Sequence, residues 1–237
     1  MTRWRGMDQK MPMTMTLHPN HQDIAKHTVL LHRLARTAYS MRTLAQSLQA
    51  NADMVCHNLA YPSRRHDIAT LARQFVLPQI NALPSVDYYV THSMGGIVLR
   101  YLLQHDLIAP PQAIVMLAPP NAGSEIVDKL GHWRAFGWLN GAAGRELGTG
   151  ADSMPNRLNA MAYALPCPVG VIIGNRSRDP LRYLLPSAND GKVTLASSRL
   201  AGADFLVLPV GHTFMMNNQA LQRQVRHFLQ YGGFRVN

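Results

Sequence analysis

The sequence has little cysteine and no long apolar run. Cys56 and Cys167 are the two cysteines in 237 residues, too few for a disulfide framework. Each lies in or beside an apolar run, so we expect buried free thiols. No stretch approaches the roughly 20 apolar residues that a membrane-spanning helix needs. Residues 1–20 are polar, basic and rich in methionine, without the apolar core of a signal peptide. The sequence therefore predicts a soluble, cytoplasmic protein.

Acidic residues are also scarce. The chain has 23 lysines and arginines against 13 aspartates and glutamates, which gives a formal net charge of +10. The basic residues are spread along the chain, as at Arg64-Arg65 and at Arg176, Arg178 and Arg182. No run interleaves basic and aromatic residues as a nucleic-acid surface does, so we expect no nucleic-acid partner. A solvated basic surface is the favoured interpretation, and peripheral contact with an anionic membrane is the alternative.

A cluster of metal ligands is missing as well. The 11 histidines are scattered, without the spacing of a metal site. We therefore expect no metal ion.

The remaining composition suits one globular α/β domain, with 47% hydrophobic residues. Apolar, β-branched runs alternate with segments whose apolar residues recur at helical spacing. This alternation predicts a mostly parallel sheet with helices on both faces and active residues at the carboxyl ends of the strands. We expect residues 1–27 to form an N-terminal arm and residues 28–237 to form the domain. The expected strands are 28–32, 53–57, 86–91, 113–118, 169–174 and 205–209.

Residues 121–166 break this alternation. The segment places Trp133, Phe136, Trp138 and Leu139 among several glycines. A long insertion of this kind is typical of a lid or of the wall of a substrate pocket. An ordinary connection with short helices is the alternative.

The most informative stretch is 88–103, which reads as a buried strand, a tight turn and an apolar helix. Ser93 occupies the turn, where a strand-to-helix elbow would expose its hydroxyl above the end of the sheet. Gly95 lets the helix and the strand approach closely. The pattern is G-x-S-x-G, with Thr91 in place of the first glycine. Ser93 is therefore the candidate nucleophile.

A serine hydroxyl needs a base to take its proton and a carboxylate to orient that base. In this architecture the chain order is serine, acid, histidine, each on a loop after a strand. His212 directly follows the sixth expected strand and is the candidate base. Asp190, after the fifth strand, is the favoured acid because of its position in that order. Asp179 lies nearer the end of the fifth strand and is its main rival.

The reaction also needs donors for the oxyanion. One is expected to be the backbone N–H of Met94, directly after the candidate nucleophile. The other should come from the loop after the first strand, where the N–H of Leu34 is the best candidate and that of Arg33 the next. His32 is interpreted as a polar residue at the strand end, without a catalytic role.

These motifs together resemble the α/β-hydrolase family, in particular its small lipase- and esterase-like members. The resemblance covers roughly residues 28–232 and implies a minimal α/β-hydrolase fold. It also implies a serine mechanism of ester hydrolysis without cofactor. The matching segments are the elbow at 91–96, the oxyanion loop at 31–34, the acid loop at 189–193 with 197–200 after it, and the base loop at 211–213.

Two residues depart from the family pattern. Arg33 replaces the glycine that usually follows the histidine of the oxyanion loop, so it either strains the loop or reaches into the pocket. Thr91 replaces the first glycine of the elbow and adds bulk beside the strand. Neither departure removes a catalytic side chain.

The sequence thus predicts a serine hydrolase that cleaves carboxylic esters, with an apolar acyl group on a small-molecule or lipid substrate. Residues 133–139 and Met215-Met216 either contact the acyl chain or pack in the core. Thioester hydrolysis and acyl transfer use the same groups and remain alternatives. A non-catalytic member of the fold that binds a lipid or a partner protein is a further alternative, because Arg33 departs from the family pattern.

Overall fold

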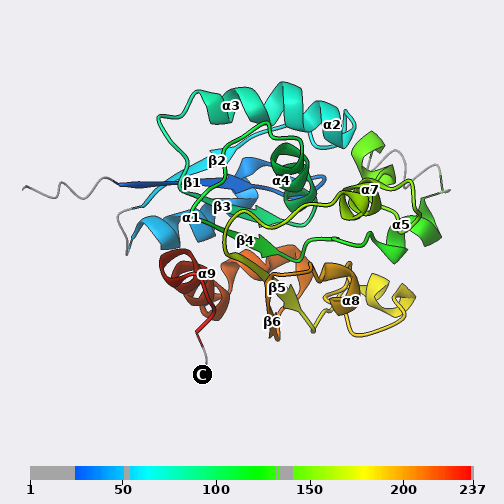
Figure 1. Ribbon diagram of the computed structural model, residues 1–237. Helices are drawn as coiled ribbons and strands as arrows, with labels where there is room; N and C mark the ends of the chain where they lie inside the picture. The colour runs from blue at the N-terminus through cyan, green and yellow to red at the C-terminus, as the bar shows by residue number, and fades with distance from the viewer. Residues whose placement is uncertain (1–24, 51–53, 132, 134–140, 236–237) are drawn as a thin grey trace, which may run out of the picture.

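The computed structural model describes residues 25–50, 54–131, 133 and 141–235, and within them the chain builds one six-stranded sheet (Figure 1). Neighbouring strands are all parallel, in the order β2-β1-β3-β4-β5-β6. The strands are β1 (Lys26–Leu31), β2 (Met54–Leu59), β3 (Tyr88–His92), β4 (Ala113–Leu117), β5 (Val169–Gly174) and β6 (Asp204–Leu208). The predicted α/β sheet is confirmed.

The six predicted strands are all present; β5 has the predicted ends, and the ends of the others are shifted. β1 begins at Lys26, two residues before the apolar run. Its first residue pairs with Met54 of β2, and Lys26 Nζ lies 3.2 Å from Asp87 Oδ1. The backbone N–H of His27 donates to the same carboxylate at 2.8 Å. Polar anchoring therefore extends the strand beyond the residues that hydrophobicity marks.

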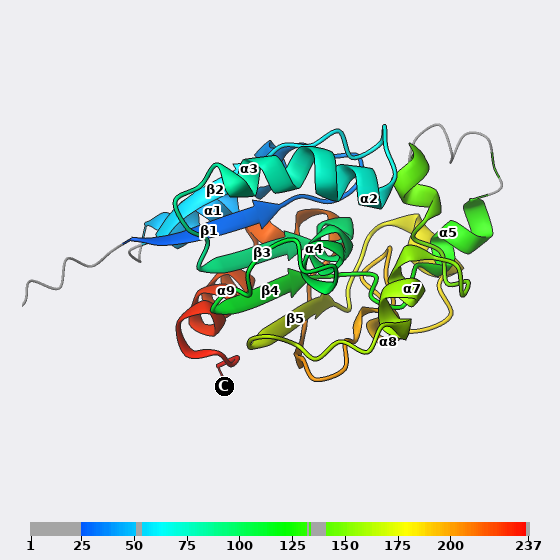
Figure 2. The same ribbon diagram turned by 45° about the horizontal axis from the view of Figure 1, so that its top comes forward.

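Helices cover both faces of the sheet, as predicted (Figure 2). On one face, α4 (Met94–Gln104) packs on β3 beneath a bent helical segment formed by α2 (Ile68–Thr70), the π-helical η2 (Leu71–Val76) and α3 (Leu77–Asn81). On the other face lie α1 (Arg42–Gln49) and α9 (Gln219–Tyr231), which contact each other.

The side chains of β1 show how the two cores are divided. Val29 and Leu31 join the core under α4, whereas Leu30 joins the core under α1 and α9. All three are fully buried. Both faces of the strand are therefore apolar, as a parallel sheet covered on both sides requires.

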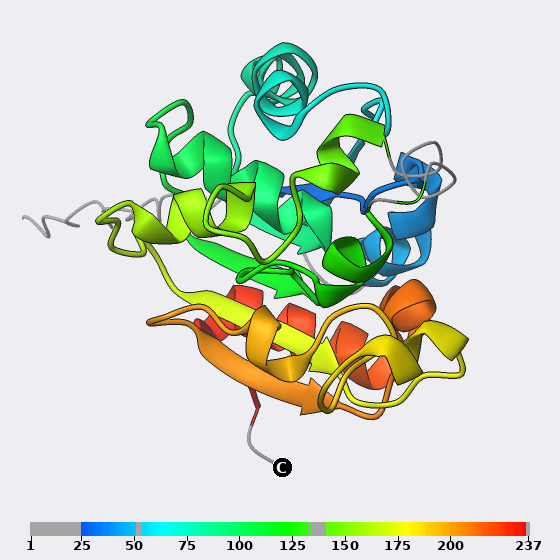
Figure 3. The same cartoon turned by 90° about the vertical axis from the view of Figure 1, so that its right-hand side faces the viewer.

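Figure 3 shows β5 and β6 running side by side across the view. The shorter elements gather at the carboxyl ends of the strands. These elements are the 3-10 helix η1 (Ala38–Met41), α5 (Glu125–Leu130), α7 (Met154–Ala160), the 3-10 helix η3 (Pro180–Leu184), α8 (Leu195–Ser198) and the 3-10 helix η4 (His212–Asn217). Loops at this edge of a parallel sheet form the binding sites of such folds.

Some expectations fall on residues outside the described part of the chain. The N-terminal arm predicted for 1–27 lies almost wholly outside it, and the insertion at 121–166 is described except for 132 and 134–140. Cys56 and Cys167 are free, as predicted, but both are half-buried rather than buried. None of the described helices has both the length and the apolar character needed to cross a membrane.

Candidate active site

Ser93 forms a sharp turn between β3 and α4. Its φ and ψ are 55° and −121°, an unusual conformation for a residue with a side chain. The neighbours fix this turn, because the Ser93 N–H donates to the Leu117 carbonyl at 2.8 Å and the Ser93 carbonyl accepts from the Gly96 N–H at 2.9 Å. Such local strain is often kept at functional sites. Ser93 is therefore placed at the carboxyl edge of the sheet, where the sequence predicts it.

Gly95 explains how closely α4 approaches the loop after β1. A Cβ atom at this position would lie 2.6 Å from the Leu31 carbonyl oxygen and 3.0 Å from that of His32. Real Cβ atoms do not come so close to backbone, so only glycine allows this packing. The N-terminal turn of α4 is therefore in contact with the loop that holds Leu34.

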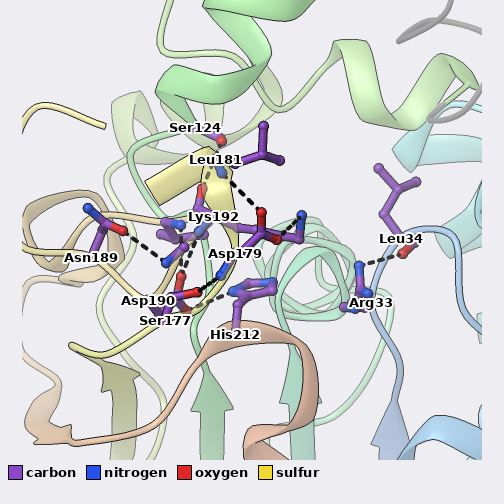
Figure 4. A network of polar contacts seen from close by, with 12 residues as sticks. Arg33, Leu34, Ser124, Ser177, Asp179, Leu181, Asn189, Asp190, Lys192 and His212 are labelled. Atoms are coloured by element: carbon purple, nitrogen blue, oxygen red, sulfur yellow. Dashed lines mark hydrogen bonds and ion pairs between the residues drawn. The ribbon is translucent and has the colours of Figure 1, made fainter. Parts of the chain in front are cut away.

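His212 and Asp190 are joined by a short contact on the loops after β6 and β5. His212 Nδ1 lies 2.7 Å from Asp190 Oδ2, and the His212 N–H donates to the Asp190 carbonyl at 2.9 Å (Figure 4). Both side chains are almost completely buried, at 3% and 0% exposure. A carboxylate at Nδ1 fixes the tautomer of the ring and leaves Nε2 as the nitrogen that can accept a proton.

The Asp190 carboxylate is held on its other oxygen as well. Oδ1 accepts the backbone N–H groups of Lys192 at 3.0 Å and Val193 at 2.9 Å. Gly191 allows this tight turn, since its φ is +102° and a Cβ atom would lie 2.2 Å from Ser177 Oγ. The Asp-Gly pair is thus both a turn and a fixed carboxylate, and charged hydrogen bonds of this kind orient the group strongly.

Asp179, the rival acid, is engaged elsewhere. Its side chain accepts the Leu181 N–H at 3.0 Å at the start of η3 and lies 3.2 Å from Lys192 Nζ (Figure 4). Among the described contacts, none joins Asp179 to His212. The structure therefore pairs His212 with Asp190 rather than with Asp179.

The expected oxyanion donors lie on two segments that touch. Met94 begins α4, and the first N–H groups of a helix have no acceptor within the helix. Leu34 lies on the loop after β1, which contacts the start of α4 at Gly95. No hydrogen bond from the Leu34 N–H to a described residue is seen. That these two N–H groups bind one oxyanion stays a prediction.

Arg33 departs from the resembled pattern without straining the backbone. The described non-glycine residues with positive φ are Ala35, Ser93, Asp106 and Ala118, so Arg33 does not occupy a conformation reserved for glycine. Its side chain is partly buried, and Nη1 donates weakly to the Leu34 carbonyl at 3.4 Å. Burial and the nearby Arg36 lower the pKa of Arg33 to about 10, while Asp179 and Asp190 act in the opposite direction. Arg33 therefore remains a cation at neutral pH, on the side of the site opposite His212 (Figure 4).

Thr91 is accommodated by a second glycine. Its side chain is fully buried, and a Cβ atom at Gly96 would lie 3.2 Å from Thr91 Oγ1. Gly96 on α4 has no side chain and thus leaves room for the side chain of Thr91.

His92 is a neighbour of the site that the sequence analysis did not single out. Its ring lies 4.9 Å from that of His212, centroid to centroid, and is fully buried. Burial, together with His212 and Arg33, holds the pKa of His92 well below its usual range, so the ring is neutral at pH 7. The contact brings the end of β3 next to the base loop, although no hydrogen bond between Ser93 Oγ and His212 is present among the described residues. In the sequence, the position of His92 directly before Ser93 is the one signal that could have identified it as a neighbour of the site.

The expected acyl-chain contacts are only partly described. Met215 and Met216 are buried in the core between the sheet and α9. Of the aromatic segment 133–139, only Trp133 lies within the described residues, and it is 59% exposed. His32, which was expected to have no catalytic role, stacks on Tyr61 with 4.1 Å between ring centroids. No group of three or more metal-ligating side chains is found in the described part of the chain.

Solved structures share this fold at low sequence identity. The mature lipase BlEst2 of Bacillus licheniformis is 18% identical, with a TM-score of 0.66 over 88% of this chain and 93% of the other. The metagenomic carboxyl esterase MGS0156 is 16% identical, with a TM-score of 0.66 over 97% and 81%. The chain has the α/β-hydrolase fold. Phospholipase PlaB of Legionella pneumophila is 18% identical, with a TM-score of 0.64 over 88% of this chain and 60% of the other.

No protein-family model and no curated protein sequence matches the chain. The α/β-hydrolase fold predicted from the motifs is therefore confirmed by structure alone. Its solved neighbours include lipases and esterases.

Proposed function

We propose that this α/β-hydrolase cleaves carboxylic esters with Ser93 as nucleophile, His212 as base and Asp190 as the acid that orients it. The observation that carries the proposal is the buried contact of 2.7 Å between His212 Nδ1 and Asp190 Oδ2, on a loop packed beside the end of β3. A buried carboxylate on a histidine next to a serine in a strained turn is typical of acyl-transfer sites.

In this mechanism Ser93 Oγ attacks the ester carbonyl while His212 Nε2 takes its proton. The C–O bond to the alcohol then breaks, and His212 returns the proton to the leaving oxygen. A water molecule attacks the acyl-enzyme in the same way and releases the carboxylic acid and free Ser93. Asp190 stays ionised throughout and stabilises the imidazolium.

The backbone N–H groups of Met94 and Leu34 are proposed to hold the oxyanion. The support is the contact between the start of α4 and the loop after β1, which Gly95 permits. Donors that are already in place lower the energy of the tetrahedral intermediate without reorganisation.

The preferred substrate is proposed to have an apolar acyl group, as expected from the aromatic insertion. A panel of p-nitrophenyl esters from acetate to dodecanoate tests activity and acyl preference together. We expect kcat/KM to rise with chain length. A matched butyryl thioester shows whether thioesters are better substrates than oxygen esters.

The panel is run on the wild type and on S93A, H212A and the control S153A. Ser153 is a similarly buried serine, and its hydroxyl has no hydrogen-bond partner among the described residues. The first two variants should lose at least about a thousandfold in kcat, whereas the control should keep full activity. Equal activity of S93A and the wild type would refute the proposal.

A further inference from the structure

A large cleft lies beside His212, between the loops that follow β5 and β6. It has a volume of about 1100 Å³ and is lined by residues of 175–182 and 209–218. His212 is part of its wall, whereas Ser93 is not among the lining residues. The cleft is therefore adjacent to the proposed base but separate from the nucleophile.

The wall of the cleft carries positive charge without compensation. It includes Arg176, Arg178 and Arg182, and among the described lining residues the one carboxylate is that of Asp179. That carboxylate is already used, since it contacts Lys192 Nζ at 3.2 Å and the Leu181 N–H at 3.0 Å.

The three arginines differ in how they are held. Arg182 Nη1 donates to the Ser177 carbonyl at 2.8 Å, which fixes its guanidinium at the wall. Arg176 and Arg178 are exposed and have no ion-pair partner in the described part of the chain. A further cation, Arg36, lies beside the cleft. Its guanidinium is 6.0 Å from the ring centroid of Phe214, which lines the cleft and is 67% exposed.

The chemistry of the proposed function indicates which half of a substrate reaches this cleft. His212 must return its proton to the leaving alkoxide, so the alcohol half of the ester lies against His212. The acyl half lies instead at the oxyanion donors. An alcohol half that extends past His212 therefore enters the cleft.

We propose that the cleft binds an anionic group, a phosphate in particular, on the alcohol half of the ester substrate. This inference rests on the proposed function and narrows its substrate class. Guanidinium groups bind phosphate oxygens through paired N–H donors, and two or three of them around one cleft suit a dianion better than a neutral alcohol. The ester bond that breaks is the carboxylic one, so the phosphate leaves intact on the released alcohol.

The test compares 1-hexanoyl-glycerol 3-phosphate with 1-hexanoyl-glycerol, two short esters that differ by the phosphate. The protein is the full chain, as wild type, as R176Q/R178Q and as the control R223Q, because Arg223 is exposed on α9 away from the cleft. We expect the wild type to favour the phosphate ester at least about tenfold in kcat/KM, since each charged hydrogen bond contributes roughly that factor. The double variant should lose this preference and keep its rate on the neutral ester, and the control should behave as the wild type.

Inhibition separates a subsite for the alcohol half from a site for free phosphate. Glycerol 3-phosphate should inhibit hydrolysis of the phosphate ester at lower concentration than inorganic phosphate does. Equal inhibition by the two anions overturns the assignment to the alcohol half. A wild type without preference, or a double variant that loses activity equally on both esters, overturns the proposal while ester hydrolysis itself stands. If neither ester nor any p-nitrophenyl ester is hydrolysed, the proposed function fails and the cleft proposal fails with it.

Discussion

His212 Nδ1 lies 2.7 Å from Asp190 Oδ2, and the two side chains are shielded from solvent. Asp179, although nearer to β5 in the sequence, lies against Lys192 and η3 instead. Of the two aspartates that the sequence leaves open as partners of His212, the structure therefore favours Asp190.

Replacing Asp190 by asparagine should reduce kcat on p-nitrophenyl butyrate by about a thousandfold or more, because the amide no longer fixes the proton on Nδ1. The same change at Asp179 removes an ion pair that is partly exposed and should leave kcat within about twofold. Steady-state kinetics of the two variants give the answer. Full activity of D190N with loss in D179N would reverse the assignment.

Replacing Gly95 by alanine should destabilise the protein by about 1–3 kcal/mol, since the new Cβ atom meets backbone and forces α4 away from the loop after β1. Urea unfolding measures the change. The control is G150A, because a Cβ atom at Gly150 has nothing within 4 Å. Equal unfolding midpoints for the two variants would mean that the close approach at Gly95 is absent in solution.

The lowered pKa of His92 predicts that stability falls in acid. The unfolded chain binds this proton below about 6.5, the usual pKa of histidine, while the folded protein does not until the pH is much lower. The contribution of His92 to the free energy of unfolding should therefore be level above pH 7 and decrease below about 6.5, by at most about 1.4 kcal/mol per pH unit for this one proton. His32, whose pKa is also lowered by burial, contributes in the same direction.

The variant H92F isolates the His92 contribution. The ring of His92 is fully buried, and a phenyl ring of similar size should be tolerated in its place. Urea unfolding between pH 5 and pH 8 should show a shallower acid slope for H92F than for the wild type. Identical slopes would show that His92 titrates normally in the folded protein.

Replacing Arg33 by methionine should leave the free energy of unfolding unchanged or raise it by up to about 1 kcal/mol. The guanidinium is partly buried, its Nε has no partner among the described residues, and Arg36 is nearby. Thermal unfolding of R33M, with R223M as an exposed control, measures the effect. A loss above about 2 kcal/mol would identify Arg33 as a structural anchor of the loop.

The sequence predicts the sheet well because each central strand is an apolar run buried on both faces. It predicts less well where polar groups extend a strand, as at Lys26 and His27, whose contacts with Asp87 connect segments about 60 residues apart. Such pairing follows from the tertiary structure, and no local pattern marks it.

The candidate site, like the sheet, is only partly predictable from the sequence. Ser93 and His212 are candidates from the sequence because each follows a strand in a fixed chain order. The sequence favours Asp190 but leaves Asp179 open, and only the fold shows which of them contacts His212. The proximity of His92 to His212 and the arginine-lined cleft are not predictable, since both depend on how loops from separate strands pack together. Arg176, Arg178 and Arg182 lie close together in the sequence, but only the fold shows that their loop and residues 209–218 line one cleft.

Labelling with a fluorophosphonate ester, followed by peptide mass spectrometry, tests the central claim most directly. The folded wild type should carry one phosphonate on Ser93, and the S93A variant should carry none. D190N should react much more slowly, because its base is no longer oriented. A folded wild-type protein that remains unmodified at Ser93 would contradict the assignment of this serine as the nucleophile.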